Sequence, residues 1–182
     1  MKHLNPHNAI LELERLVSSN DSEIKLQANG GNSILLVCKP SEEINFISEL
    51  HQLEASKYQI IDLNQILVEF VENNREDVEF YLERLQASLD RIFKNDLDAQ
   101  PDLFHLIIDK VEQVFQDKKI PVIINTGVIY ATHFDMLSLM ESKTIMDAAL
   151  PAVFLYPAEY NQNNQLEYLN TRIASEYRCK II

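Results

Sequence analysis

Polar residues follow the apolar runs of this sequence, which is where α/β proteins place groups that bind ligands or carry out reactions. Ligands of an open parallel sheet bind beyond the carboxyl ends of its strands. The residues at these predicted ends are Lys39, Ser41, Asp62, Asn64, Asn125, Thr126, Tyr156 and Glu159. Such side chains suit a small enzyme or a nucleotide-binding protein, but the same residue types also cap helices and form turns. The set indicates no single reaction, and both interpretations stay open.

The first predicted strand lacks a functional phosphate-binding loop. A P-loop follows its strand with G-x-x-x-x-G-K-[ST], because backbone N–H groups and the lysine together hold the phosphates. Here Ser33–Cys38 is followed by Lys39–Pro40–Ser41–Glu42–Glu43, which contains no glycine and places two carboxylates where phosphates would bind. Gly30 and Gly31 precede the strand instead. The sequence therefore predicts a P-loop-like arrangement that is degenerate and binds no cofactor.

Other catalytic signatures are absent from the sequence. It contains no G-x-S-x-G segment, and His51, His105 and His133 are isolated from one another. A zinc site needs three or four closely spaced histidine, cysteine or carboxylate ligands. We therefore expect no catalytic residue and no metal site.

Short apolar runs rich in valine and isoleucine predict buried strands of a parallel sheet. The predicted strands are Ser33–Cys38, Tyr58–Leu63, Pro121–Ile124 and Ala152–Tyr156, with two short final strands at Gln165–Leu169 and Tyr177–Ile182. Amphipathic patterns predict a helix at Asn8–Ser19 and another after Ser41, a suitable N-cap. The first two strands and the helix between them predict a βαβ unit with a parallel pair. The expected fold is α/β, a three-layer-like sandwich with a mostly parallel central sheet.

A helical insertion at residues 64–119 separates the second and third predicted strands of what we expect to be one α/β domain, residues 1–182. Asn73–Asn74 is expected to divide its long helix, which runs to Lys94, and Pro101 is expected to open the next one. Glu69–Asp102 carries ten acidic and four basic residues, half of the net charge of −12. This stretch is either a solvated helical face or a docking surface for a basic partner.

The overall composition is that of an acidic globular protein. Hydrophobic residues make up 46% of the chain, and its pI is about 4.8. An acidic surface repels a phosphate backbone, which disfavours broad nucleic-acid binding. Arg172, Arg178 and Lys180 keep a local nucleic-acid-binding role open. Cys38 and Cys179 suit free thiols, and no membrane-length apolar run or signal core is present, so the sequence predicts a cytoplasmic protein.

Four segments of the sequence share motifs with one known family. They are a Gly-x-x-Tyr segment in Thr126–Tyr130, a helix at Met136–Glu141, a strand ending in Tyr-Pro at Pro151–Pro157, and a Tyr-Arg segment in Tyr177–Ile182. Together they resemble the BrxB family of bacteriophage-exclusion (BREX) defence systems. Length and element order also agree, so the resemblance covers most of the chain.

The resemblance implies a non-enzymatic adaptor or assembly protein. Its implied partners are a PglZ-type phosphatase-fold protein, a BrxC-type ATPase and a DNA adenine methyltransferase, with self-association as a further expectation. The implied interaction or structural residues are Gly127, Tyr130, Tyr156, Pro157, Tyr177 and Arg178. The sequence departs from the family pattern at Ala158, where glycine is common, and at His133–Asp135, which lacks the family's arginine.

The final segment, Tyr177–Ile182, is expected to pair with the main sheet and bury part of its apolar side, because it ends in two β-branched residues. Arg178 is then expected to lie beside Gly127–Tyr130 or beside Tyr156–Pro157. The planar guanidinium suits either tying such loops together or holding an acidic group of a partner.

Overall fold

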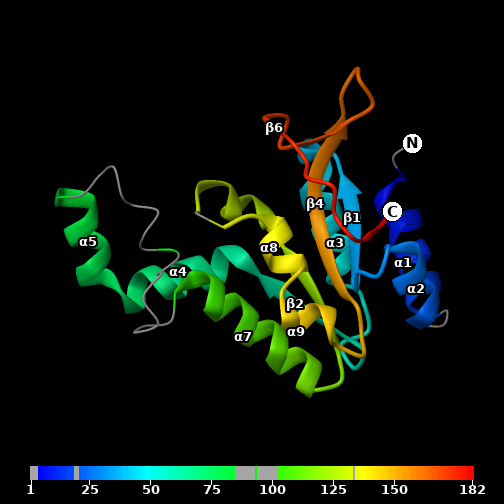
Figure 1. Ribbon diagram of the computed structural model, residues 1–182, viewed down its shortest axis with the longest axis horizontal. Helices are drawn as coiled ribbons and strands as arrows, with labels where there is room; N and C mark the ends of the chain where they lie inside the picture. Colours follow the sequence, from blue (N-terminus) through cyan, green and yellow to red (C-terminus); the bar gives the residue numbers. More distant parts are fainter. Residues whose placement is uncertain (1–3, 19–20, 85–92, 94–101, 133) are drawn as a thin grey trace.

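A mostly parallel seven-stranded sheet lies at the centre of the computed structural model, which describes residues 4–18, 21–84, 93, 102–132 and 134–182 (Figure 1). The strands that pair in parallel, in spatial order, are β2 (Tyr58–Asp62), β3 (Ile120–Ile124), β4 (Ala152–Tyr160), β1 (Ser33–Cys38) and β7 (Lys180–Ile181). At the end of β4, the antiparallel strands β5 (Leu166–Tyr168) and β6 (Arg172–Ile173) extend the sheet. The predicted α/β class and parallel sheet are confirmed.

Helices cover both faces of the sheet, so β1 and β3 are buried along their whole length. Side chains of a strand alternate between faces, and Ile34 and Leu36 accordingly pack in one core while Leu35 and Val37 pack in the other. The first core is closed by α1 (Pro6–Ser18), α2 (Asp21–Gln27) and α3 (Glu43–Leu50). The second is closed by α4 (Leu63–Asn73), α7 (Leu103–Gln116), α8 (Met136–Met140) and α9 (Lys143–Met146).

The predicted parallel pair of β1 and β2 is wrong, because β3 and β4 lie between these two strands. β1 pairs with β4 from Ser33 to Cys38, and β2 pairs with β3 from Tyr58 to Asp62. A βαβ pattern indicates that two strands share a sheet and a direction, but it does not exclude later strands from inserting between them.

The helical insertion is the crossover that connects the neighbouring parallel strands β2 and β3. α4 ends at Asn73 and α5 (Arg75–Arg84) follows Asn74, which confirms the predicted break. In Figure 1, α5 lies at the end of the long axis away from the sheet. The Asp102 carboxylate caps α7 by accepting the His105 backbone N–H at 2.8 Å. The predicted helix between residues 85 and 92, its end at Lys94 and the opening at Pro101 lie outside the described residues.

The junction after β1 differs from its prediction. Ser41 does not cap α3, because it lies inside the 3-10 turn η1 (Pro40–Glu42), and no side chain caps the helix that follows. β4 also runs past the predicted strand end at Tyr156, and it pairs with β1 up to Pro157 and with β5 from Ala158. Both cysteines are free, as expected, and both are buried.

The predicted pairing of the C-terminal segment with the sheet is confirmed, although the strand itself is only Lys180–Ile181. The strand runs parallel to β1 at the edge of the sheet. Gly31 allows the backbone that precedes β7 to pass close by, because a Cβ on Gly31 would lie 1.7 Å from the Arg178 carbonyl oxygen. Among the described residues, no helix is long and apolar enough to cross a membrane.

Candidate functional site

Three of the motif residues, Tyr130, Tyr156 and Tyr177, line one hollow together with Tyr168 and Arg172. Tyr156 comes from β4, and Tyr168 reaches it because Ala158 of β4 is paired with Tyr168 of β5. The hollow has a volume of 20 Å³, which is room for about one water molecule. It is therefore a packed junction of aromatic side chains and not a pocket for a nucleotide.

The aromatic rings of this tyrosine cluster (Tyr156, Tyr168 and Tyr177) are held in defined geometry. Tyr156 and Tyr168 stack with centroids 4.5 Å apart and an interplanar angle of 17°, and Tyr177 meets Tyr156 edge-on at 5.7 Å. The hydroxyls of Tyr156 and Tyr177 are hydrogen-bonded at 2.9 Å. The Tyr168 hydroxyl donates to Thr126 Oγ1 at 3.4 Å, and Thr126 in turn donates to the Leu155 carbonyl at 2.9 Å. The cluster thus joins β4, β5, η3 (Thr126–Ala131) and the segment before β7.

Burial raises the pKa of Tyr156, Tyr168 and Tyr177 above the usual phenol value. The hydrogen bond to Tyr177 raises the pKa of Tyr156 further. All three phenols therefore stay protonated at neutral pH, where a general base has to be deprotonated. Protonated phenols suit packing and hydrogen bonding.

Tyr177→Phe is expected to lower the free energy of unfolding by about 1 kcal/mol, because it removes the hydroxyl that pairs with Tyr156. Urea unfolding of the wild type, Tyr177→Phe, Tyr156→Phe and the double variant measures the coupling directly. Additive effects of the two single substitutions would contradict the hydrogen bond.

The same cluster predicts a loss of stability at alkaline pH. Because folding raises the pKa of these phenols, their contribution is complete below the unfolded value, about 10, and is lost as pH rises toward the folded values. The free energy of unfolding should therefore fall above that pH, and less steeply in Tyr177→Phe than in the wild type. Equal slopes of the free energy of unfolding against pH in the two proteins would exclude a contribution of Tyr177 to the alkaline loss of stability.

The remaining motif residues lie in other settings. Gly127 belongs to η3, and a Cβ there would meet only Leu169 Cδ1, at 3.8 Å, so space does not require glycine. Pro157 lies in β4, where its carbonyl accepts the Leu169 N–H at 2.9 Å. Arg178 Nε donates to Glu141 Oε1 at 2.8 Å, so its hydrogen-bond partner follows α8 and belongs to neither of the two predicted segments.

Asp62, Asn125 and Thr126, at the ends of β2 and β3, form side-chain hydrogen bonds within the fold. Asp62 Oδ1 accepts both the Asn64 backbone N–H at 2.9 Å and the Asn125 side-chain amide at 2.7 Å. Asn125 adopts the left-handed conformation, with φ of 56°, which asparagine tolerates better than most residues. The Thr126 hydroxyl is buried and bonds to the Leu155 carbonyl. These bonds join the ends of β2 and β3 to each other and to the middle of β4, and they favour the capping interpretation.

Glu43, after β1, is a carboxyl group whose partial burial the sequence pattern does not reveal. Burial raises its pKa, and within the described part of the chain its Oε1 has no hydrogen-bond partner. Burial, and then the nearby Glu43 carboxylate, raise the pKa of the Cys38 thiol. Because thiolates and not thiols act as nucleophiles, Cys38 is an unreactive core residue. Residues 4–18, 21–84, 93, 102–132 and 134–182 contain no cluster of side chains that could hold a metal ion.

The three cations of the predicted nucleic-acid patch lie in different surroundings. Arg172 lines the tyrosine hollow, and Arg178 pairs with Glu141. Lys180 lines a separate groove beside α1. Their surroundings give no support to a shared phosphate-binding surface.

No family model, curated protein or solved structure matches this chain. Asp62, Asn125, Thr126 and the tyrosine cluster are used in bonds that hold the fold together.

Proposed function

We propose that this chain is a non-enzymatic component of a BREX-type anti-phage defence system, in which it acts as an adaptor or assembly protein. The resemblance to the BrxB family motivates the proposal. Its implied partners are the PglZ-type phosphatase-fold protein, the BrxC-type ATPase and the methyltransferase. The P-loop-like arrangement stays a prediction.

The observation that carries the proposal is an acidic arm, defined as residues 69–84 at the end of α4 and in α5. Every acidic side chain of this arm is exposed: Glu69, Glu72, Glu76, Asp77, Glu79 and Glu83. Lys110 lies 3.6 Å from Glu69, and Arg75 lies 3.0 Å from Glu79. Among the described residues, the other four carboxylates form no ion pair.

The position of the arm suits a docking element. α5 extends away from the sheet along the long axis of the molecule (Figure 1). Val68, just before the arm, is 56% exposed and adds an apolar contact surface. A field of one sign accelerates and orients association with a partner of opposite charge, and salt screens it.

Charge reversal of the arm is expected to abolish capture of a basic partner. The arm variant replaces four carboxylates by lysine, at Glu72, Glu76, Asp77 and Glu83. A control variant makes the same change of net charge at exposed sites outside the arm, at Glu54, Asp117, Asp147 and Glu176. Each protein is immobilised and exposed to the purified products of the genes that flank its own.

We expect the wild type and the control variant to capture at least one of these products, with binding that weakens as salt increases. Loss of capture in the arm variant alone would support the docking role. Equal capture by all three proteins would show that the arm is only a solvated face.

A further inference from the structure

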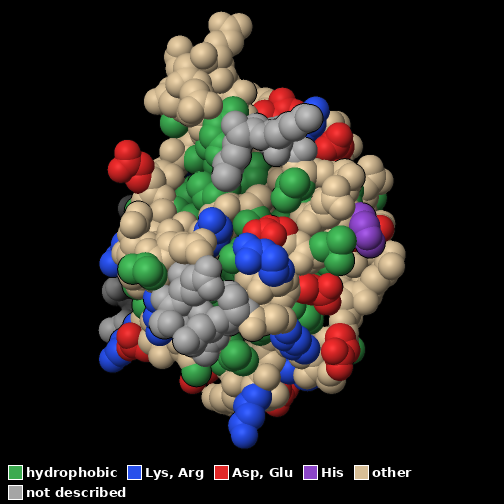
Figure 2. Space-filling model, turned by 90° about the vertical axis from the view of Figure 1, so that its right-hand side faces the viewer, with side chains coloured by type: hydrophobic (Ala, Val, Ile, Leu, Met, Phe, Trp, Pro, Cys, Tyr) green, Lys and Arg blue, Asp and Glu red, His purple; other side chains and the backbone are tan. Residues whose placement is uncertain are grey.

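A groove of about 600 Å³ lies between α1 and the β7 edge of the sheet. Its apolar lining includes Leu4 and Leu11 on the side of α1 and Val37, Ile181 and Ile182 on the side of the sheet. Leu4 and Leu11 are 38% and 51% exposed, so apolar surface faces solvent here. Figure 2 shows this side of the molecule, where hydrophobic side chains gather in a hollow beside charged ones.

The groove borders an open strand edge. The Ile182 N–H donates to the Leu35 carbonyl at 3.0 Å, and the Ile182 carbonyl accepts the Val37 N–H at 2.9 Å. Successive residues of a strand direct their backbone groups to opposite sides. The N–H and C=O of Ile181 therefore point away from β1, and no described residue bonds to them.

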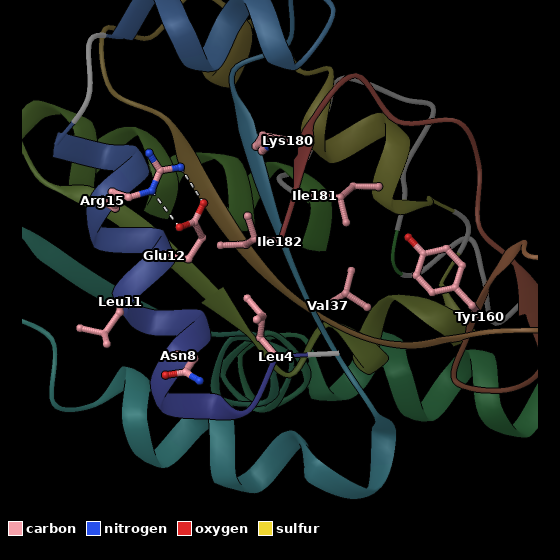
Figure 3. A pocket seen from close by; sticks show the side chains of 10 residues that line it. All are labelled: Leu4, Asn8, Leu11, Glu12, Arg15, Val37, Tyr160, Lys180, Ile181 and Ile182. Carbon is pink, nitrogen blue, oxygen red and sulfur yellow. Dashed lines mark hydrogen bonds and ion pairs between the residues drawn. The ribbon is translucent and has the colours of Figure 1, made fainter. Parts of the chain in front are cut away.

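The side chains at this edge lie on both faces of the sheet, as a site for an added strand requires. In Figure 3, Ile182 points toward α1, whereas Ile181 points the opposite way, toward the side of Tyr160. An extended peptide alternates its own side chains between two faces. A strand placed against Ile181 would therefore direct one set of side chains toward Leu4 and Leu11 and the other toward the far side of the sheet.

The charges of the groove favour an acidic occupant. Arg15 and Glu12 neutralise each other through two hydrogen bonds of 2.8 and 2.7 Å (Figure 3). Lys180 lies close enough to contribute to lowering the pKa of Glu12, after the larger effect of Arg15. Within the described part of the chain, Lys180 itself forms no ion pair. Lys180 thus adds a positive charge to the wall of the groove, on a chain with a net charge of −12.

We infer that this groove binds an extended segment of a partner protein, which adds as a strand to the outer edge of β7, with apolar side chains against Leu4 and Leu11 and a carboxylate near Lys180. This inference rests on the proposed adaptor function and deepens it by naming where a partner segment binds. Main-chain hydrogen bonds to Ile181 would provide affinity, and the apolar groove would select side chains. A second copy of this chain is disfavoured, because two chains of net charge −12 repel each other and a two-residue edge offers only a short ladder.

Ile181→Pro tests the added strand directly. Proline at this position removes the outward N–H and leaves the bonds of Ile182 to β1 in place, and proline is tolerated on the solvent side of an edge strand. Ile181→Ala is the matched control, because it shortens the same side chain and keeps the N–H. The probes are overlapping synthetic peptides that cover whichever flanking-gene product the wild type captures. We expect Ile181→Pro to bind the best peptide about tenfold more weakly than Ile181→Ala, as loss of one hydrogen bond predicts.

Lys180→Glu provides a second measurement that leaves the strand intact. It should weaken binding of a peptide that contains aspartate or glutamate and should not weaken binding of the same peptide with those residues changed to asparagine or glutamine. Lys143→Glu, an exposed lysine of α9 outside the groove, makes the same charge change and should bind like the wild type. Circular dichroism verifies that each variant is folded.

The outcomes separate the inference from the proposed function. If the wild type captures a flanking-gene product, and Ile181→Pro and Lys180→Glu bind its peptides as the wild type does, the groove inference is wrong while the adaptor role stands. If the wild type captures no flanking-gene product, both fail. If light scattering shows a dimer of this chain that Ile181→Pro dissociates, the occupant is a second copy and the inference is overturned.

Discussion

Gly31→Ala is expected to lower the free energy of unfolding by about 3 kcal/mol, the upper range for forcing extra atoms into a packed site. A Cβ at this position would lie 1.7 Å from the carbonyl oxygen and 2.6 Å from the carbonyl carbon of Arg178. Both atoms belong to the backbone, so they cannot move aside as the end of a flexible side chain would. The segment that carries β7 has to shift, and its pairing with β1 is expected to be lost.

Urea unfolding measures the change in the free energy of unfolding, and amide hydrogen exchange measures whether β7 still pairs with β1. Gly127→Ala is the control, because the nearest atom to its Cβ would be a side-chain carbon 3.8 Å away, an ordinary contact distance. We expect the control to stay within about 0.5 kcal/mol of the wild type. A Gly31→Ala protein with unchanged stability and a protected Ile182 amide would show that the C-terminal segment does not pack against Gly31.

Asn32→Ala is expected to destabilise the fold by about 2–3 kcal/mol. Asn32 is 3% exposed, and its side-chain amide lies 2.9, 3.0 and 2.9 Å from the carbonyls of Ile145, Ala148 and Leu150. The backbone carbonyl of the same residue accepts the Ala152 N–H at 3.0 Å. The substitution removes the side-chain amide that donates to these three carbonyls, which lie in α9 and in the turn between α9 and β4.

Thermal and urea unfolding of Asn32→Ala should be compared with Asn64→Ala, which changes an exposed asparagine at the start of α4. The control is expected to unfold like the wild type. Equal midpoints for both variants would contradict the role of Asn32 as the link between β1 and the start of β4.

Local sequence patterns predict much of the fold, and the wrong predictions concern contacts between segments that are distant in the sequence. The runs Ser33–Cys38 and Ile120–Ile124 are apolar on both faces, so the sequence indicates buried parallel strands correctly. The neighbours of β1 are β4 and β7, more than a hundred residues away, and no local signal specifies them. The same holds for Gly31: the sequence shows a turn, but only the fold brings the Arg178 backbone against it.

The candidate site was predicted in part. The family resemblance singles out Tyr130, Tyr156 and Tyr177, and the structure places them around one hollow. The sequence does not indicate Tyr168, although this residue lies in a predicted strand, because its contact with Tyr156 depends on the antiparallel register of β4 and β5. No local pattern reveals the groove beside β7, since its walls combine residues from the two ends of the chain with Val37 and Tyr160.

Size-exclusion chromatography with light scattering tests the adaptor role most directly. The purified chain is mixed at micromolar concentration with the purified products of its flanking genes, first singly and then together. We predict a peak whose mass equals that of this chain plus at least one of those proteins. Elution of the chain alone, with every one of those proteins present, would contradict the adaptor role.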